Sequence, residues 1–283
     1  MKIVITGAKG QLGLEIVNQL DNLNNIREKN IYDIVPTDRS NLNITDLENV
    51  NNFIFKEMPD VVINCAAYTK VDLCENDIDN AYKVNALGVR NLATACEKIK
   101  AKFVQISTDY VFDGNSNIPY KEDCITFPNS IYGKSKLMGE YFTRQFSSKY
   151  FIIRTAWLYG DGDNFVRTML NLAKNNNEIN VVDDQIGSPT STVELAEAII
   201  NLIETDYYGI YHGTCEGECS WYEFANKIFE LSKITVKVNP ITSNEFKREA
   251  PRPMYSVLDN FMLKLIGLNN FNRWDEALKK YLE

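Results

Sequence analysis

The sequence predicts an α/β protein: a Rossmann-type, doubly wound parallel sheet with a smaller C-terminal lobe. Three observations indicate this class. Short apolar runs alternate with helical patterns over the first two thirds of the 283 residues, as in successive βαβ units. Runs such as VVIN and FIIR are apolar on consecutive residues, which is typical of strands covered on both faces. A glycine-rich turn, GAKGQLG, directly follows the first apolar run.

Each expected strand of the first part is followed by an expected helix. The strand and helix pairs are 2–6 with 11–20, 32–38 with 46–57, 59–67 with 80–99, and 102–108 with 130–146, before a fifth strand at 150–160. Because parallel strands need a crossover connection, this order predicts helices on both faces of one sheet.

The pattern changes at about Val181. Short strands are expected at 179–185 and 209–213, helices at 192–204 and 220–232. We therefore expect a dinucleotide-binding domain with the catalytic helix at 1–180. Residues 181–283 should form mainly a substrate-binding lobe that returns in part to the main sheet. The boundary is soft, since no linker rich in Gly, Pro or Ser marks it.

Composition excludes several classes of partner. A net charge of −8 and a pI near 5.0 argue against a nucleic-acid-binding surface. The chain begins without a signal-like segment, and no apolar run approaches the ~20 residues that span a bilayer, so no membrane partner is expected. The six cysteines are scattered, which favours reduced thiols in the cytoplasm and no metal site. Residue types leave the oligomeric state open, with a homodimer as one candidate.

The turn Gly7-Ala8-Lys9-Gly10-Gln11-Leu12-Gly13 lies between an expected strand and an expected helix. In that context Gly7 permits a tight turn, Gly10 lets the backbone approach a pyrophosphate, and Gly13 allows close helix–sheet packing. The phosphates would lie against free N–H groups at the positive end of the helix dipole. The turn, Gln11 and Leu12 included, is therefore a predicted dinucleotide site.

The end of the second expected strand carries Asp38 and Arg39. An acid at this place hydrogen-bonds the 2′-hydroxyl of NAD, whereas a neighbouring arginine accommodates the 2′-phosphate of NADP. The pair leaves the choice open; the carboxylate favours NADH as the cofactor, with NADPH as the alternative.

Ligands of doubly wound sheets bind at the carboxyl ends of the strands. The third and fourth expected strands end in NCAAYT and ISTDYVFDG. The residues expected to face the dinucleotide or its partner are Ala66, Ala67, Tyr68, Ile106, Ser107, Thr108 and Asp109.

Tyr132 and Lys136 are spaced one helical turn apart in SIYGKSK. Alone, such a pair is usually packing plus a solvated ammonium. On a dinucleotide-binding sheet the pair has a chemical use: a free tyrosine has a pKa of about 10, and a nearby ammonium favours the phenolate.

These motifs together resemble the extended short-chain dehydrogenase/reductase family, and within it the dTDP-4-dehydrorhamnose reductases. The likeness runs over nearly the whole chain, through GAKGQLG, NCAAYTKVDLCE, STDYVFDG, YGKSKLMGE, RTAWLYG, DDQIGSPT and RPMYSVLD. The resemblance implies that Tyr132 is the proton donor, that Lys136 lowers its pKa and holds the nicotinamide ribose, and that Thr108 steadies the substrate carbonyl.

The resemblance also implies NAD(P)H-dependent reduction of the 4-keto group of dTDP-4-dehydro-L-rhamnose to dTDP-L-rhamnose, with a nucleotide-sugar as the small-molecule partner. Trp157 would contact the substrate with Thr108 and Asp109, and Arg252 could pair with its diphosphate. Asn43 and Ile44 stand near the adenine site, where the family usually has an acid before the apolar residue.

Two alternatives stay open. One is a non-catalytic, dinucleotide-binding regulatory subunit; retention of Thr108, Tyr132 and Lys136 together argues against it. The other is a different nucleotide-sugar epimerase or dehydratase on the same scaffold. Dehydratases tend to carry an acidic pair after the hydroxyl residue, whereas here only Asp109 precedes Tyr110. The lone histidine, His212, is expected to be structural.

Overall fold

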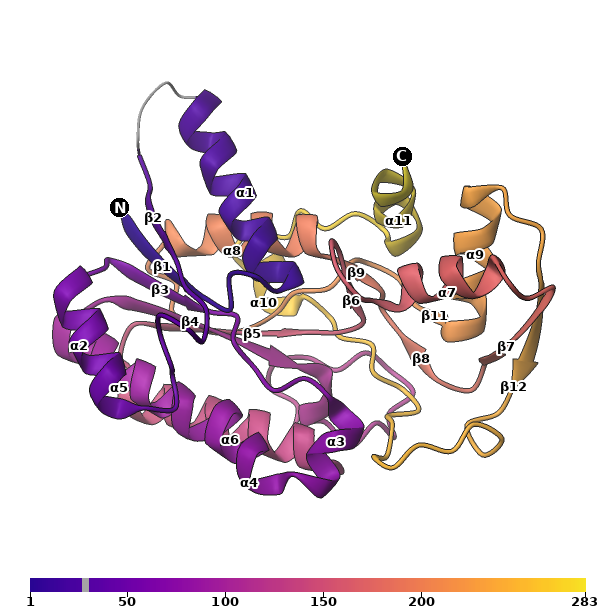
Figure 1. Cartoon of the computed structure of the whole chain (residues 1–283), viewed down its shortest axis with the longest axis horizontal. Helices are drawn as coiled ribbons and strands as arrows, with labels where there is room; N and C mark the ends of the chain where they lie inside the picture. The colour runs from indigo at the N-terminus through magenta and orange to yellow at the C-terminus, as the bar shows by residue number, and fades with distance from the viewer. Residues whose placement is uncertain (27–30) are drawn as a thin grey trace.

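Six parallel strands form the central sheet of the computed structural model, which describes residues 1–26 and 31–283 (Figure 1). Their order across the sheet is β10-β5-β4-β3-β1-β2. The strand order therefore switches at β1, with β2 on one side of it and β3, β4, β5 and β10 on the other. The strands are β1 (Lys2–Thr6), β2 (Asp33–Pro36), β3 (Val61–Asn64), β4 (Lys102–Thr108), β5 (Tyr150–Thr155) and β10 (Gly209–His212). The predicted doubly wound parallel sheet is confirmed.

Helices cover both faces of this sheet, as Figure 1 shows. On one face α1 (Gln11–Ile26) and α8 (Thr192–Ile203) pack over Ile3 and Ile5. On the other, α2 (Leu47–Glu57) and α5 (Val89–Ile99) pack over Val4, beside α6 (Ile131–Phe146). Alternate residues of β1 thus serve opposite cores, which explains why the strand reads as an unbroken apolar run.

The predicted helix at 80–99 is divided. It begins as α4 (Ile78–Tyr82), just after α3 (Val71–Asn76), and widens into a π-helix at Lys83–Gly88 before it continues as α5. Such widened turns occur mostly at functional sites. Here the π-helix buries Asn85, whose amide oxygen accepts from Tyr68 N at 2.8 Å and whose amide nitrogen donates to the Tyr68 carbonyl at 3.1 Å. The segment after β3 is fixed in this way.

The second lobe packs at one end of the sheet (Figure 1). Strand β7 (Glu178–Val182) pairs in parallel with β12 (Lys237–Ile241), and β8 (Ile186–Gly187) pairs antiparallel with β11 (Cys219–Ser220). Its other elements are β6 (Leu158–Tyr159), α7 (Phe165–Ala173), β9 (Thr190–Ser191), α9 (Trp221–Ser232) and α11 (Trp274–Leu282), whereas α10 (Phe261–Leu265) packs against β10 of the main sheet. The expected division at 180 and 181 falls inside β7 and stays a proposal. The chain rejoins the main sheet at β10.

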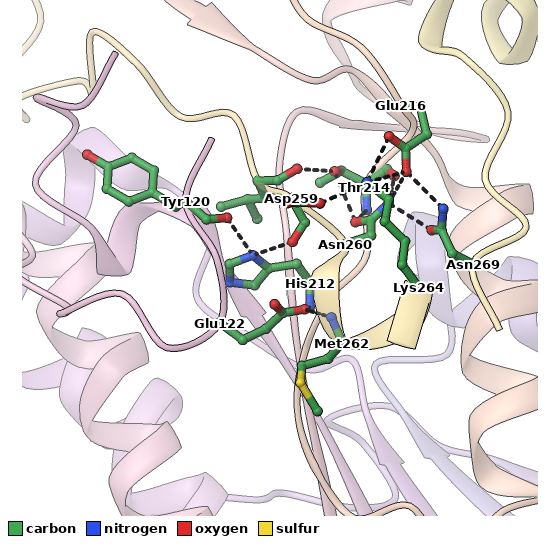
Figure 2. A network of polar contacts seen from close by, with 11 residues as sticks. Tyr120, Glu122, His212, Thr214, Glu216, Asp259, Asn260, Met262, Lys264 and Asn269 are labelled. Atoms are coloured by element: carbon green, nitrogen blue, oxygen red, sulfur yellow. Dashed lines mark hydrogen bonds and ion pairs between the residues drawn. The ribbon is translucent and has the colours of Figure 1, made fainter. Parts of the chain in front are cut away.

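A buried polar network joins this returning strand to the C-terminal segment (Figure 2). His212 is fully buried, and its Nδ1 lies 3.1 Å from the Tyr120 carbonyl oxygen and 3.2 Å from that of Asp259. Because both partners are acceptors, Nδ1 carries the proton. One Glu122 carboxylate oxygen accepts from the backbone N–H groups of His212 and Met262. His212 thus ties β10 to the segment before α10.

In the part of the chain that the structure describes, no helix combines the length and the apolar character needed to cross a bilayer. All six cysteines lie in described residues and are free thiols.

Candidate active site

A cavity of about 880 Å³ opens at the carboxyl ends of β1, β3 and β4. The sequence predicted a ligand site at this edge of the sheet. Nineteen of the twenty predicted site residues line the cavity: Gly7, Gly10, Gln11, Leu12, Gly13, Asp38, Arg39, Asn43, Ile44, Ala66, Ala67, Tyr68, Ile106, Ser107, Thr108, Asp109, Tyr132, Lys136 and Trp157. The structure therefore brings the glycine turn, the strand ends and two side chains of α6 to one place.

The glycine turn joins β1 to α1 and forms the floor of the cavity. Gly7 has a φ of 63°, and a Cβ there would lie 2.8 Å from the Ala66 backbone nitrogen. Only glycine permits both this left-handed backbone and this approach to the end of β3. Gln11, at the start of α1, reaches across the cavity mouth and donates to the Asp163 carbonyl at 3.0 Å. The turn is thus fixed on both sides.

At one end of the cavity Asp38 is held by three groups. Its Oδ1 accepts from the Ser40 N–H at 2.7 Å and from the Ser40 hydroxyl, and its Oδ2 pairs with the Lys9 ammonium. The hydrogen bonds from Lys9 and then Ser40 hold the Asp38 pKa well below its usual range. Lys9 and Arg39 both line the cavity, so two cations flank one carboxylate.

Thr108 ends β4 and starts a short turn that continues through Asp109 and Tyr110. Its Oγ1 donates to Asp109 Oδ1 at 2.8 Å and accepts from Tyr110 N at 3.3 Å. Helix α6 packs directly on this turn, because a Cβ on Gly133 would overlap the Tyr110 carbonyl oxygen. Gly133 thus lets the neighbouring Tyr132 approach Thr108.

Helix α6 begins at Ile131, and the Ser130 hydroxyl caps it by accepting from Gly133 N at 3.1 Å. Tyr132 and Lys136 are both buried, with 9% and 4% of their surface exposed. The Tyr110 ring meets the Tyr132 ring edge-on, with centroids 5.4 Å apart. Lys136 Nζ donates to the Ile106 carbonyl at 2.5 Å. Both side chains are therefore fixed at the cavity wall.

The pKa of Tyr132 differs from the sequence-based prediction. Burial, and then the Asp109 charge, raise the Tyr132 pKa above its ordinary value, and the Thr108 hydroxyl opposes this. Lys136 is not among the groups that shift the Tyr132 pKa, and its ammonium donates to the Ile106 carbonyl. Burial lowers the Lys136 pKa to about 8, which leaves the group mostly protonated at neutral pH. Tyr132 is thus a neutral phenol with a proton to give.

A buried ion pair lies behind Lys136 on the same face of α6. Glu140, one further turn along, pairs with Arg154 of β5 through two contacts of 3.0 and 2.7 Å. The Ser107 hydroxyl donates to the same carboxylate at 2.5 Å. Both members of the pair are at most 4% exposed in their side chains. The pair fixes the helix against two strands of the sheet.

Trp157 lines the opposite wall and lies in an unusual backbone conformation, with a φ of 46°. Its indole ring stacks on that of Trp221 from α9, with centroids 3.4 Å apart and planes inclined by 4°. The Trp157 carbonyl accepts from Thr190 N at 3.1 Å, which holds the strained residue in place. Trp221 therefore supports the face of the indole that is turned away from the cavity.

Among the predicted site residues, all of which the structure describes, only Arg252 does not line the cavity. Its guanidinium donates to Asp72 of α3 at 2.9 Å and to the Ala250 carbonyl at 3.2 Å. Val71, next to Asp72, does line the cavity. Arg252 thus lies behind the rim.

Sequence reasoning missed several residues that form or support the site. Lys9 and Lys83 bring cations to the cavity wall, Cys65 brings a thiol, and Trp221 and Asn85 brace wall residues from behind. The signal for Lys9 was available, since it lies inside the glycine turn. Trp221 and Asn85 carry no local pattern; their roles arise from tertiary contacts.

Comparison with protein-family models gives one match over the whole chain, residues 1–283, to the RmlD substrate binding domain. The spore coat polysaccharide biosynthesis protein SpsK of Bacillus subtilis is 44% identical over 100% of this chain and 97% of its own length.

Solved structures agree with this match. A dTDP-4-dehydrorhamnose reductase from Clostridium acetobutylicum is 52% identical with a TM-score of 0.96, covering 100% of this chain and 98% of the other. The same enzyme from Bacillus anthracis, solved in complex with NADP, is 46% identical with a TM-score of 0.93 over 99% and 98%. These likenesses extend over both lobes.

Proposed function

The chain belongs to the RmlD substrate binding domain family, and we propose that it reduces a nucleotide-linked keto sugar. The reaction is the NAD(P)H-dependent reduction of the 4-keto group of dTDP-4-dehydro-L-rhamnose to dTDP-L-rhamnose, a step in polysaccharide precursor synthesis. The observation that carries the proposal is the convergence of Thr108, Tyr132 and Lys136 on a cavity that also holds the glycine turn.

The cavity has the features that a dinucleotide needs. A Cβ on Gly7 would fill the space above the turn that a pyrophosphate needs. Helix α1 begins beside this space and has no acidic residue in its first turn to repel the phosphates. Asp38, Arg39, Asn43 and Ile44 would surround the adenosine, and Ala66, Ala67, Tyr68 and Ile106 the rest of the molecule. When bound, NADH or NADPH supplies the hydride that reduces the keto carbon.

The protein's own groups handle the charge and the proton. As the keto carbon is reduced, negative charge develops on the carbonyl oxygen, and Tyr132 gives that oxygen its proton. The raised pKa of Tyr132 keeps the phenol protonated before the reaction. Lys136 lies one helical turn away, where its ammonium would hold the nicotinamide ribose, as the resemblance implies. Thr108 supplies a second hydrogen bond to the same oxygen.

The substrate side of the site involves Asp109, Trp157 and Arg252. Trp157 would contact the sugar from the opposite wall. Arg252 would exchange its ion pair with Asp72 for the substrate diphosphate, as guanidinium groups suit phosphate geometry. We expect Trp157→Ala and Arg252→Ala each to raise KM by about 10-fold or more, while NADH affinity changes little. Steady-state kinetics with calorimetry would measure both; an unchanged KM would remove these residues from the substrate site.

The alternatives make different demands on the same cavity. A regulatory dinucleotide-binding subunit needs no proton donor, so that function does not explain why a protonated Tyr132 lies beside Thr108. A dehydratase or epimerase would return the hydride to its substrate, and so would consume no NADH. Net oxidation of the cofactor distinguishes the reductase from both.

Assembly and location are further parts of the proposal. Met138 and Tyr141 of α6 are 37% and 51% exposed and border a shallow hollow with Tyr150. This partly apolar surface, which Arg144 and Gln145 also line, is a candidate contact for a homodimer, which light scattering would test against a monomer. The six free thiols support a reducing compartment, the cytoplasm.

The direct experiment presents the purified protein and NADH with a panel of nucleotide 4-keto sugars. We expect loss of the nicotinamide absorbance with dTDP-4-dehydro-L-rhamnose, and formation of one equivalent of dTDP-L-rhamnose for each NADH oxidised. Cofactor binding without oxidation on any member of the panel would favour the regulatory subunit. Conversion of a sugar without net NADH loss would favour an epimerase or dehydratase.

A further inference from the structure

We propose that Asp109 is a positioning residue that acts through Thr108: in its neutral form, it frees the hydrogen of the Thr108 hydroxyl, which Thr108 then donates to the substrate oxygen. This inference rests on the proposed function, since it concerns the hydrogen bond that Thr108 gives to the keto group. It adds a role for a carboxyl that the Tyr132 and Lys136 chemistry does not use.

The argument begins with the single proton of the Thr108 hydroxyl. That proton is donated to Asp109 Oδ1 at 2.8 Å, and the same oxygen accepts from Tyr110 N at 3.3 Å. A hydroxyl has one hydrogen to donate and two lone pairs. While Asp109 is ionised and takes the hydrogen, Thr108 has none for a carbonyl oxygen that is gaining negative charge.

The surroundings of Asp109 shift its carboxyl toward the neutral form. The residue is 3% exposed, and its Oδ2 has no hydrogen-bond partner among the described side chains and backbone. No lysine or arginine of the described chain forms an ion pair with it. An orphaned, buried carboxylate oxygen is costly, whereas a protonated carboxyl leaves less charge unsolvated. Burial raises the Asp109 pKa to about 6, against the opposing contacts of Thr108 and Ser256.

The charged and titratable groups around Asp109 are few. Tyr132 faces it from α6, and Tyr110 follows it in the chain. The ion pair of Arg252 with Asp72 lies beyond Tyr110. Of these, both tyrosines are neutral at physiological pH because burial raises their pKa values. Titration in the range around pH 6 therefore belongs to Asp109.

Protonation of Asp109 reverses the hydrogen bond. The neutral carboxyl donates its own proton to Thr108 Oγ1, and the Thr108 hydrogen is released toward the cavity, which both residues line. Thr108 and Tyr132 then present two donors to the keto oxygen, and no covalent bond changes. Ionised Asp109 would leave only Tyr132.

The test compares Asp109→Asn with Asp109→Leu. The asparagine amide donates at every pH, so it replaces the neutral carboxyl; leucine has a similar volume and no donor. We expect Asp109→Leu to lower kcat by about 10²-fold, the value of one donor at a developing oxyanion. Asp109→Asn should lose less than about 10-fold by the same reasoning. NADH binding should persist in both variants.

The pH profile separates this role from a purely structural one. Wild-type kcat should fall as pH rises through the Asp109 pKa, and Asp109→Asn should lack that fall while keeping the later one due to Lys136. In a Thr108→Val background the difference between Asp109→Asn and Asp109→Leu should vanish. Equal losses in Asn and Leu, an unchanged profile in Asn, or a persisting difference without the Thr108 hydroxyl would each overturn the proposal.

A second measurement does not depend on turnover. Carboxyl ¹³C NMR of the protein with bound NADH should show Asp109 titrating above pH 5, and titration near pH 4 or below would overturn the inference. A protein that binds NADH, shows this titration and reduces none of the keto sugars would instead contradict the proposed function.

Discussion

At the scale of single residues, we expect the contacts of Asp38 to set the relative affinities of the site for NADH and NADPH. The carboxylate should disfavour the 2′-phosphate of NADPH, but it is paired with Lys9, and Arg39 lies beside it at the cavity wall. We therefore expect wild type to bind NADH more tightly than NADPH, by a margin that Lys9 reduces. Removing the Asp38 charge should reduce the preference for NADH, and removing the Lys9 charge should increase it.

Calorimetric titration of both cofactors would measure the effect. Asp38→Ala should narrow the preference for NADH, and Lys9→Met should widen it, each by about 5-fold, as suits one exposed charge. Lys9→Arg keeps the charge and serves as the matched control. A wild type that clearly favours NADPH would contradict the role assigned to Asp38. Equal ratios for Lys9→Met and Lys9→Arg would contradict that of Lys9.

The same residues show what sequence can and cannot supply about a site. The glycine turn and the Tyr132–Lys136 spacing were readable because each is a local pattern with a chemical requirement. The direction of the Tyr132 pKa shift was predicted wrongly, because the burial of its phenol and the nearby charge of Asp109 depend on the folded environment. The position of Arg252 behind the rim likewise depends on Asp72, from a segment far away in the sequence.

At the scale of elements, α6 carries the proposed proton donor Tyr132, and the ion pair of Glu140 with Arg154 of β5 holds the helix against the sheet. Arg154→Met would leave the Glu140 carboxylate buried and unpaired, at a cost of about 3–5 kcal/mol of unfolding free energy. Urea denaturation would measure the loss. The double variant Glu140→Gln with Arg154→Met removes both charges and should recover part of it. A single variant as stable as wild type would show that the pair does not anchor the helix.

Most elements of the sheet were predictable, and the exceptions have physical causes. Strands β1, β3, β4 and β5 are apolar on consecutive residues because helices cover both faces. The π-helix at 83–88 was missed because one widened turn hardly disturbs a helical pattern. The two-residue strands β6, β8, β9 and β11 are set by tertiary contacts and have too little sequence to show a period.

At the scale of the whole molecule, the returning strand β10 and the C-terminal segment depend on a neutral His212. Burial, and then the Arg154 charge, lower the His212 pKa to about 3. As pH falls, the imidazole of His212 is protonated in the unfolded chain before it is protonated in the folded protein. The free energy of unfolding that depends on His212 therefore decreases as pH falls from 6.5 toward 3. The slope is at most about 1.4 kcal/mol per pH unit. Asp109, with its raised pKa, acts in the opposite direction between about pH 6 and 4.

Comparison with His212→Asn isolates the histidine contribution. Asparagine keeps an N–H donor for the Tyr120 and Asp259 carbonyls but does not titrate. Urea denaturation between pH 7.5 and pH 4, chosen to bracket the ordinary histidine pKa of about 6.5, should show wild type losing more stability than the variant. Parallel pH dependences in the two proteins would mean that His212 is not held neutral in the fold.

The central claim is that Tyr132 gives the proton in reduction of the keto sugar, and Tyr132→Phe tests it most directly. Phenylalanine keeps the ring and its packing against Tyr110 but has no proton to transfer. With saturating NADH and dTDP-4-dehydro-L-rhamnose, kcat should fall by at least about 10²-fold while NADH affinity is retained. Turnover near the wild-type rate with the cofactor bound would contradict the account.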